Sequence, residues 1–182
     1  MDTTYNLRGQ TIDKDIKALA LSHSEALHYQ PLADSVLISY ANYDYGKMAT
    51  PLPASVKKRY QAVLELAVDD IDQKNPKIRS FFSRIYPQDN YHIFDEKDLK
   101  RTFIFMEKYQ NSHFVVHCDA GISRSSATAL AIAKRYAPKD YQKLLDFGIY
   151  FPNVLIYSYL VDGTYNDQLA KKYRKELHPW GF

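Results

Sequence analysis

The stretch from His117 to Ser125 reads His-Cys-Asp-Ala-Gly-Ile-Ser-Arg-Ser and contains the one cysteine of the chain. The apolar run 113–116 precedes this stretch, as expected of a buried strand, and the alanine-rich run 125–133 follows it, as expected of a helix. The sequence therefore predicts a loop between a strand and a helix, with a thiol at its start and a guanidinium near its end.

A loop of this kind is suited to bind an anion. Several N–H groups point inward where a tight loop enters a helix, and the helix N-terminus adds roughly half a positive charge. Gly121 allows a positive φ in the middle of the loop, and Arg124 can hold two phosphate oxygens with its planar fork. The residues expected to bind phosphate are Asp119, Ala120, Gly121, Ile122, Ser123 and Arg124.

Cys118 is the expected nucleophile of this loop. The helix N-terminus and Arg124 favour the thiolate form of a thiol, and a thiolate beneath a bound phosphate ester can attack phosphorus in line. Ser125 is expected to hydrogen-bond the sulfur and to make it a better leaving group. Since loop N–H groups and Arg124 neutralise the phosphate charge, this chemistry requires no metal and no other cofactor.

The pattern Cys118-x5-Arg124-Ser125, preceded by His117 and containing Gly121, resembles the signature of the cysteine-dependent protein tyrosine phosphatases, on the dual-specificity side. The amino-acid sequence of the loop is most similar to that of the short, single-domain bacterial and phage-type members. The resemblance implies an α/β fold with a central, mostly parallel sheet flanked by helices. It also implies hydrolysis of phosphotyrosine in proteins, with phosphoserine and phosphothreonine as further substrates, through a cysteinyl phosphate.

Two further residues are expected to support this loop. Neighbouring strand residues point to opposite faces, so His117 is assigned an orienting, hydrogen-bonding role on the face away from Cys118. The segment around Asn153 resembles the Pro-Asn segment of the same family, where the asparagine supports the active-site loop. A plain helix cap is the alternative reading of Asn153.

Cleavage of a phosphate ester also needs a proton donor for the leaving oxygen, and several carboxylates follow a predicted strand at 61–68. The carboxyl ends of strands line the ligand site of an open α/β sheet, so this group is expected to face the cysteine loop. The resembled family has Asp followed by Ile at such a strand end, which favours Asp70 as the general acid. The alternatives are Asp69, Asp72 and Asp89, the last because its distance from the cysteine is near the usual family spacing.

The 182 residues predict a single phosphatase domain over 1–182. We expect an N-terminal helical segment at about 12–30, a catalytic core at about 35–160 and a C-terminal helix at about 164–178. Within the core, a strand is expected at 35–40 and a helix at 95–109. Residues 73–94 are interpreted as an insertion that either forms one wall of the substrate cleft or packs its aromatic residues into the core.

Composition limits the partners. The net charge is +3 and the basic clusters are not interleaved with aromatic residues, so no nucleic acid is expected. The sequence has no run apolar enough to cross a membrane, its start does not look like a signal peptide, and a single cysteine suits a reducing compartment. A cytoplasmic monomer acting on a phosphorylated protein or peptide is expected, with signal-independent export left open. A catalytically inactive phosphate-binding module and a phosphatase of a small phosphorylated metabolite are the alternatives.

Overall fold

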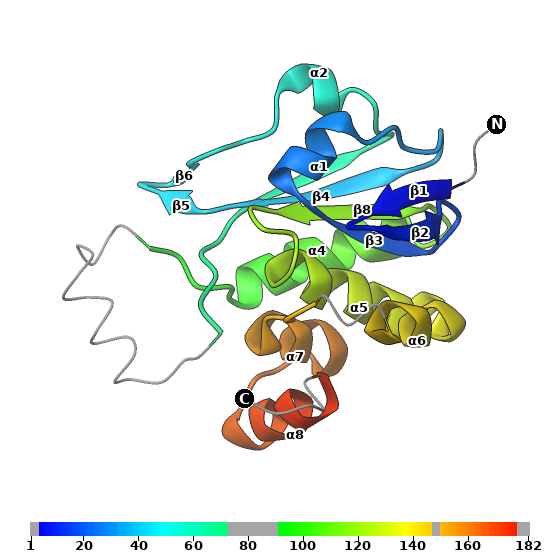
Figure 1. Cartoon of the computed structure of the whole chain (residues 1–182). Coiled ribbons are helices and arrows are strands. Elements are labelled where there is room, and N and C mark those ends of the chain that lie inside the picture. The colour runs from blue at the N-terminus through cyan, green and yellow to red at the C-terminus, as the bar shows by residue number, and fades with distance from the viewer. Residues whose placement is uncertain (1–3, 73–90, 147–149, 178–182) are drawn as a thin grey trace.

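The computed structural model describes residues 4–72, 91–146 and 150–177. At its centre is a parallel sheet of four strands in the order β3-β8-β4-β7 (Figure 1). Because all four strands are parallel, their carboxyl ends meet at one edge, where the site described below is built. The strands are β3 (Ala18–Ser22), β4 (Val36–Ala41), β7 (Val63–Ala67) and β8 (Phe114–Cys118).

Helices cover both faces of this sheet (Figure 1). One face carries α1 (His23–His28) and α2 (Ala54–Lys57). The other carries α4 (Glu96–Lys108), α5 (Arg124–Tyr136), α6 (Pro138–Asp146), α7 (Val154–Asp162) and α8 (Asp167–Leu177). The central helix is α5, which packs on β3 and β8 and is buried without a break from Arg124 to Ala133. The predicted α/β fold with a parallel sheet is therefore confirmed.

Two short antiparallel hairpins accompany the sheet: β1 (Thr4–Leu7) with β2 (Gln10–Asp13), and β5 (Tyr43–Asp44) with β6 (Lys47–Met48). In each turn both central residues have a positive φ, as a type I′ turn requires. In the first turn these residues are Arg8 at +51° and Gly9 at +85°. The side chain of Arg8 reaches the cysteine loop, as described below.

Several predicted elements agree with the structure. The expected strands at 35–40 and 61–68 correspond to β4 and β7, and the expected helix at 95–109 corresponds to α4, with Asp95 as its N-cap. The C-terminal helix expected at about 164–178 is α8. Residues 73–90 of the predicted insertion lie outside the described residues, so neither reading of that segment is tested.

The predicted N-terminal helical segment at 12–30 is wrong. Only His23–His28 is helical, and Ala18–Ser22 before it is β3, which pairs in parallel with β8. Ala18 to Leu21 are all buried, since helices cover both faces of the sheet to which this strand belongs. A short run that is apolar on every side fits a buried strand as well as a helix. The predicted start of the core at residue 35 is consequently too late, because β3 is part of the central sheet.

A partly buried polar cluster attaches α8 to the rest of the fold. Lys134 of α5 forms an ion pair with Glu176 of α8 at 2.8 Å and lies 5.2–5.5 Å from the ring centres of three tyrosines. Tyr141 also donates to the Glu176 carboxylate at 2.7 Å. The tyrosines around the ammonium group are Tyr141, Tyr157 and Tyr173.

None of the described helices is both long and apolar enough to cross a membrane.

Candidate active site

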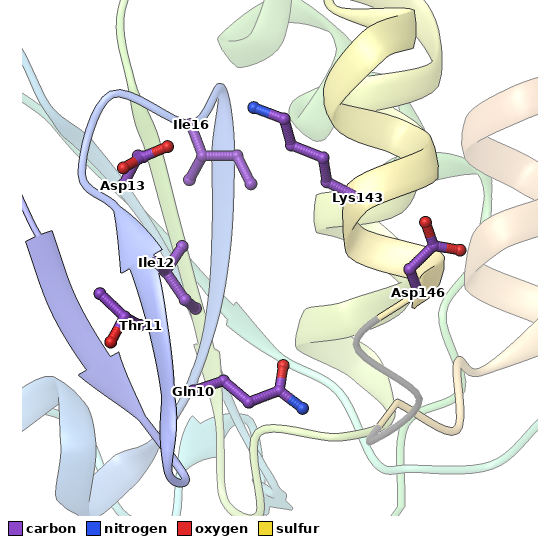
Figure 2. A pocket seen from close by; sticks show the side chains of 7 residues that line it. All are labelled: Gln10, Thr11, Ile12, Asp13, Ile16, Lys143 and Asp146. Atoms are coloured by element: carbon purple, nitrogen blue, oxygen red, sulfur yellow. The ribbon is translucent and has the colours of Figure 1, made fainter.

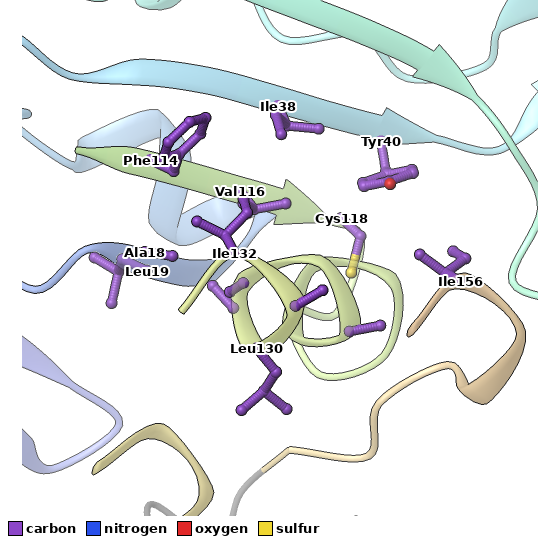
Figure 3. Packing of buried hydrophobic residues seen from close by; sticks show 14 of the residues in the cluster. Ala18, Leu19, Ile38, Tyr40, Phe114, Val116, Cys118, Leu130, Ile132 and Ile156 are labelled. Carbon is purple, nitrogen blue, oxygen red and sulfur yellow. The ribbon is translucent and has the colours of Figure 1, made fainter. Parts of the chain in front are cut away.

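Cys118 is the last residue of β8 and is 1% exposed. Its side chain points from the strand end toward helix α5 (Figure 3). There Sγ lies 3.1 Å from Oγ of Ser125, the second residue of α5, which is also buried. The structure thus brings together the predicted nucleophile and the hydroxyl expected to support it, in a position sealed by the core on the strand side.

The carbonyl groups of the loop are anchored from outside. A trans peptide holds its C=O and N–H in opposite directions, and no peptide in the described chain is cis. Each carbonyl held outward therefore turns the following N–H toward the inside of the loop, where an anion would be bound. The outer donors are His23 N to Asp119 O (3.1 Å), Arg8 Nη2 to Ala120 O (3.0 Å), Phe151 N to Ile122 O (2.7 Å) and Asn153 N to Ser123 O (3.2 Å).

Gly121 is buried in the middle of this loop with a φ of +73°. A Cβ at this position would collide with the backbone N of Ser22 and with the guanidinium of Arg8. Both the positive φ and the lack of space require glycine. The loop therefore packs tightly against the end of β3 and the turn of the β1–β2 hairpin.

Arg124 opens helix α5 and is 3% exposed. Its Nη1 donates to the carbonyl of Val68 at 2.6 Å, and its Nη2 donates to the carboxylate of Asp119 at 2.8 Å. Its Nε is buried and has no hydrogen-bond partner among the described residues. An unsatisfied buried donor of a charged group is costly, so this Nε is suited to donate to an oxygen of a bound anion.

The N-terminus of α5 is also uncapped. Ser123 is its N-cap residue, but the Ser123 hydroxyl makes no bond to the first turn of the helix. It donates instead to Oδ1 of Asp70 at 2.7 Å. The free N–H groups of the first turn and the Nε of Arg124 therefore converge on the loop that begins at Cys118, an arrangement that favours a phosphate.

Among the predicted acids, Asp70 is the one that the structure joins to this loop. Its Oδ1 accepts hydrogen bonds from Ser123 Oγ and from Asn153 Nδ2, the latter at 2.9 Å. Its Oδ2 has no hydrogen-bond partner in the described part of the chain. Two donors on Oδ1 leave Oδ2 as the oxygen that can carry a proton. Oδ1 of Asn153 caps α7 at Ile156 N, while its amide group donates to Asp70, so the side chain links the start of α7 to the carboxylate.

The other candidate acids are placed differently. The carboxylate of Asp69 accepts hydrogen bonds from the backbone N of His92 at 2.8 Å and of Tyr43 at 3.3 Å. It therefore links the segment after β7 to the segments that contain His92 and Tyr43. Burial raises the pKa of Asp69, partly offset by those hydrogen bonds. The carboxylate of Asp72 faces Arg174 on α8 at 3.8 Å. Asp89 lies outside the described residues.

His117 lies on the sheet face opposite Cys118, as the strand alternation predicts. Its Nε2 is 2.7 Å from Ser39 Oγ on the neighbouring strand β4, and its ring meets that of His23 edge-on at 5.7 Å. Burial, and then the nearby His23, lower the pKa of His117 to about 4. The imidazole is therefore neutral at physiological pH and links two strands through Ser39.

This burial predicts a pH-dependent stability. The unfolded chain takes up a proton on His117 near pH 6.5 while the folded chain resists protonation until about pH 4. Stability is therefore fully present above pH 6.5 and falls as the pH drops, by about 2 kcal/mol between pH 7.5 and 5. The free energy of unfolding should be measured with urea at both pH values. Its fall between pH 7.5 and 5 should be smaller in His117→Asn than in wild type, by about 2 kcal/mol. The control His28→Asn, at an exposed site, should show the same fall as wild type. Equal losses in wild type and His117→Asn would contradict the assignment.

One group of side chains in the described residues could hold a metal ion: His92, Asp95 and Asp98. Both carboxylates are already used, because Asp95 and Asp98 form the capping box of α4. His92 Nε2 also lies 2.6 Å from Asp98 Oδ2, which raises the pKa of His92. The group therefore fits a helix cap with an ion pair and stands apart from Cys118.

A pocket of about 330 Å³ lies elsewhere, between strand β2 and helix α6 (Figure 2). Its lining mixes apolar and charged side chains that do not converge on one point. The cysteine loop contributes nothing to it. The lining residues are Gln10, Thr11, Ile12, Asp13, Ile16, Lys143 and Asp146.

The fold is that of the dual-specificity and protein tyrosine phosphatases. The crystal structure of human DUSP28 matches 92% of this chain and 98% of its own, with a TM-score of 0.50 and 18% sequence identity. The crystal structure of PTPMT1 in complex with PI(5)P matches 96% of this chain and 99% of its own, with a TM-score of 0.46 and 14% identity.

In sequence, the chain is similar to the protein phosphatase Slingshot homolog of Xenopus laevis. The two are 31% identical over 81 residues, which cover 40% of this chain. The chain spans only 11% of the length of that curated relative. No model of a known protein family matches the sequence. The predicted phosphatase-like fold is thus confirmed.

Proposed function

We propose that the protein hydrolyses phosphomonoesters through a cysteinyl-phosphate intermediate, without a metal, and that its substrate is phosphotyrosine in a protein or peptide. The observation that carries this proposal is the buried, unpartnered Nε of Arg124 at an uncapped helix N-terminus, in the loop that begins with Cys118. A phosphate group supplies the acceptors that both features lack.

Binding precedes chemistry. The inward N–H groups of the loop and Nε of Arg124 hold the phosphate oxygens, while Nη1 stays on the Val68 carbonyl and fixes the plane of the guanidinium. A second phosphate oxygen competes with the exposed carboxylate of Asp119 for Nη2. The phosphorus is then positioned above Sγ of Cys118.

In the first step, the thiolate of Cys118 attacks phosphorus and the bond to the ester oxygen breaks. Asp70 gives its Oδ2 proton to that leaving oxygen, so the alcohol or phenol departs neutral. The phosphoryl group is left on Sγ, with its developing charge held by the loop N–H groups and Arg124. Ser123 and Asn153 keep the Asp70 carboxyl in place through Oδ1.

In the second step, a water molecule attacks the cysteinyl phosphate. The Asp70 carboxylate accepts a proton from this water, the S–P bond breaks, and inorganic phosphate is released. Ser125 Oγ, 3.1 Å from Sγ, donates to the departing thiolate and makes it a better leaving group. The acid and the thiolate are then restored for the next turnover.

An aromatic residue at the loop supports phosphotyrosine as substrate. Phe151 donates its backbone N–H to the Ile122 carbonyl, which places the residue next to the loop, yet 44% of it is exposed. An exposed aromatic ring beside a phosphate site can pack on the phenyl ring of the substrate. Phosphoserine and phosphothreonine lack that ring, so we expect them to be hydrolysed more slowly.

The proposed acid can be tested with Asp70→Asn. The amide keeps the size of the carboxyl but cannot protonate the leaving group, so kcat on a phosphotyrosine peptide should fall by about 100-fold. Asp72→Asn is the matched control, because Asp72 is two residues away and faces Arg174. Its kcat should stay within about twofold of wild type.

The same assay decides between functions. Wild type should hydrolyse para-nitrophenyl phosphate and the phosphotyrosine peptide in the presence of a chelator and a reductant. If it binds tungstate but hydrolyses neither compound, the inactive phosphate-binding module replaces the proposal. If it hydrolyses para-nitrophenyl phosphate but no phosphopeptide, a small phosphorylated metabolite becomes the substrate class to search.

A further inference from the structure

We infer that Arg8, in the turn of the N-terminal hairpin, is a positioning residue for the phosphate-binding loop and sets the affinity of that loop for phosphate. This inference rests on the proposed function of the loop and adds a residue to it. Arg8 precedes Ala120 by 112 positions in the sequence, and the hairpin is not part of the central sheet. Its side chain nevertheless reaches the loop beside the Cys118 strand.

The guanidinium of Arg8 makes three hydrogen bonds. Its Nε and Nη2 donate to the two carboxylate oxygens of Glu25, each at 3.1 Å, and Nη2 also donates to the carbonyl of Ala120 at 3.0 Å. A bidentate carboxylate fixes the plane of a guanidinium. Glu25 therefore aims Nη2 of Arg8 at the loop.

Glu25 is itself held in place. Its Oε2 accepts from the backbone N of Ser22 at 2.7 Å, and its own backbone N donates to the Ser22 hydroxyl. This capping box begins α1, at the position where β3 lies beside Cys118 in the sheet register. The arginine is thus anchored on the sheet edge that carries the nucleophile, and only 23% of its side chain is exposed.

The consequence for the loop follows from peptide geometry. The Ala120 carbonyl and the Gly121 N–H belong to one planar unit and point in opposite directions. Because Arg8 holds the carbonyl outward, the Gly121 N–H faces inward, toward the expected phosphate. Among the described residues, Arg8 is the one side chain with a hydrogen bond to this carbonyl.

The backbone of Arg8 has the conformation that its turn requires. A φ of +51° is costly for a residue with a side chain, and type I′ turns ordinarily contain Asn, Asp or Gly at this position. Tyr45 has the same conformation in the second hairpin, at +44°, so the positive φ belongs to the turn. The assignment of Arg8 therefore rests on its bonds to Glu25 and Ala120.

The test compares Arg8→Ala, Arg8→Lys and the control Arg135→Ala. Arg135 also pairs with a glutamate through Nε and Nη2, at 3.2 and 2.9 Å, but on the surface at the far end of α5. For Arg8→Ala, kcat/KM on para-nitrophenyl phosphate should fall and the inhibition constant of inorganic phosphate should rise, each by about tenfold. Arg8→Lys keeps one donor for the Ala120 carbonyl, so its kcat/KM and its inhibition constant for phosphate should lie between those of Arg8→Ala and wild type. Arg135→Ala should change neither kcat/KM nor the inhibition constant by more than about twofold.

A second measurement separates positioning from folding. The amide ¹⁵N–¹H resonance of Gly121 should shift on addition of phosphate in wild type, and this shift should shrink in Arg8→Ala. If Arg8 only stabilised the fold, Arg8→Ala would lower Tm but leave the inhibition constant and the Gly121 shift unchanged, which would overturn the inference. Wild type that hydrolyses nothing would instead contradict the proposed function, because the Gly121 shift on phosphate binding is measured independently of turnover and still tests the role of Arg8.

Discussion

Cys118→Ser should abolish hydrolysis of para-nitrophenyl phosphate, with a loss in kcat of at least about 10,000-fold. The serine hydroxyl is a far weaker nucleophile than a thiolate, and the adjacent His117 cannot activate it, since its ring lies on the other face of the sheet with Ser39. The chain has one cysteine, so no second thiol can take over. The loop N–H groups and Arg124 are untouched by this change.

Cys118→Ser should therefore still bind phosphate. Its affinity for tungstate, measured by calorimetry, and its Tm should stay close to those of wild type, because serine fits the buried site beside Ser125. Iodoacetate should inactivate wild type in step with the loss of one thiol, and tungstate should protect it. Turnover above about a hundredth of wild type in Cys118→Ser would contradict the assignment of the nucleophile.

Arg124→Lys should lower kcat/KM by about 1,000-fold. Lysine keeps the positive charge but loses the planar fork, so it cannot donate to the Val68 carbonyl and hold two phosphate oxygens together. The transition state, with its charge spread over three oxygens, should lose more than the ground state. Most of the effect should therefore appear in kcat.

Arg101→Lys provides the matched control for Arg124→Lys. Arg101 also donates from Nη2 to a carbonyl of β7, that of Glu65 at 2.8 Å, but it lies on α4 and is not in contact with the loop. Its kcat/KM should stay within about twofold of wild type. An Arg124→Lys enzyme that keeps a tenth of wild-type kcat/KM would mean that the guanidinium fork is not the phosphate clamp. The Tm of the variant, compared with that of wild type, checks that it is folded.

The cysteine loop could be predicted from the sequence because its determinants are local. The strand, the glycine, the arginine and the helix start all lie within one short stretch around Gly121, and each restricts its neighbours. The position of Asp70 beside the loop could be predicted as well, because the carboxyl ends of parallel strands share an edge. Its role as the general acid stays a prediction. Of the two alternative roles given to Asn153, the structure shows the helix cap, and the amide group also bonds Asp70. The supporting role in an active site stays a prediction.

Other parts depend on contacts that leave no local signal. The pattern Ala-Leu-Ala-Leu at 18–21 suits a helix or a buried strand, and pairing with β8 decides between them. The bonds of Arg124 to the Val68 carbonyl and of Arg8 to the Ala120 carbonyl use backbone acceptors, which every residue type has. The Arg8-Gly9 pair signals at most a turn, so its partner more than a hundred residues away could not be inferred.

The account depends above all on a covalent intermediate at Cys118. The direct test is a rapid-quench reaction of the enzyme with para-nitrophenyl phosphate, followed by mass spectrometry of the peptide that contains this cysteine. We predict a burst of para-nitrophenol equal to the enzyme concentration and the mass of one phosphoryl group added to that peptide in wild type, with neither in Cys118→Ser. Turnover by wild type without a burst and without an adduct would contradict the mechanism.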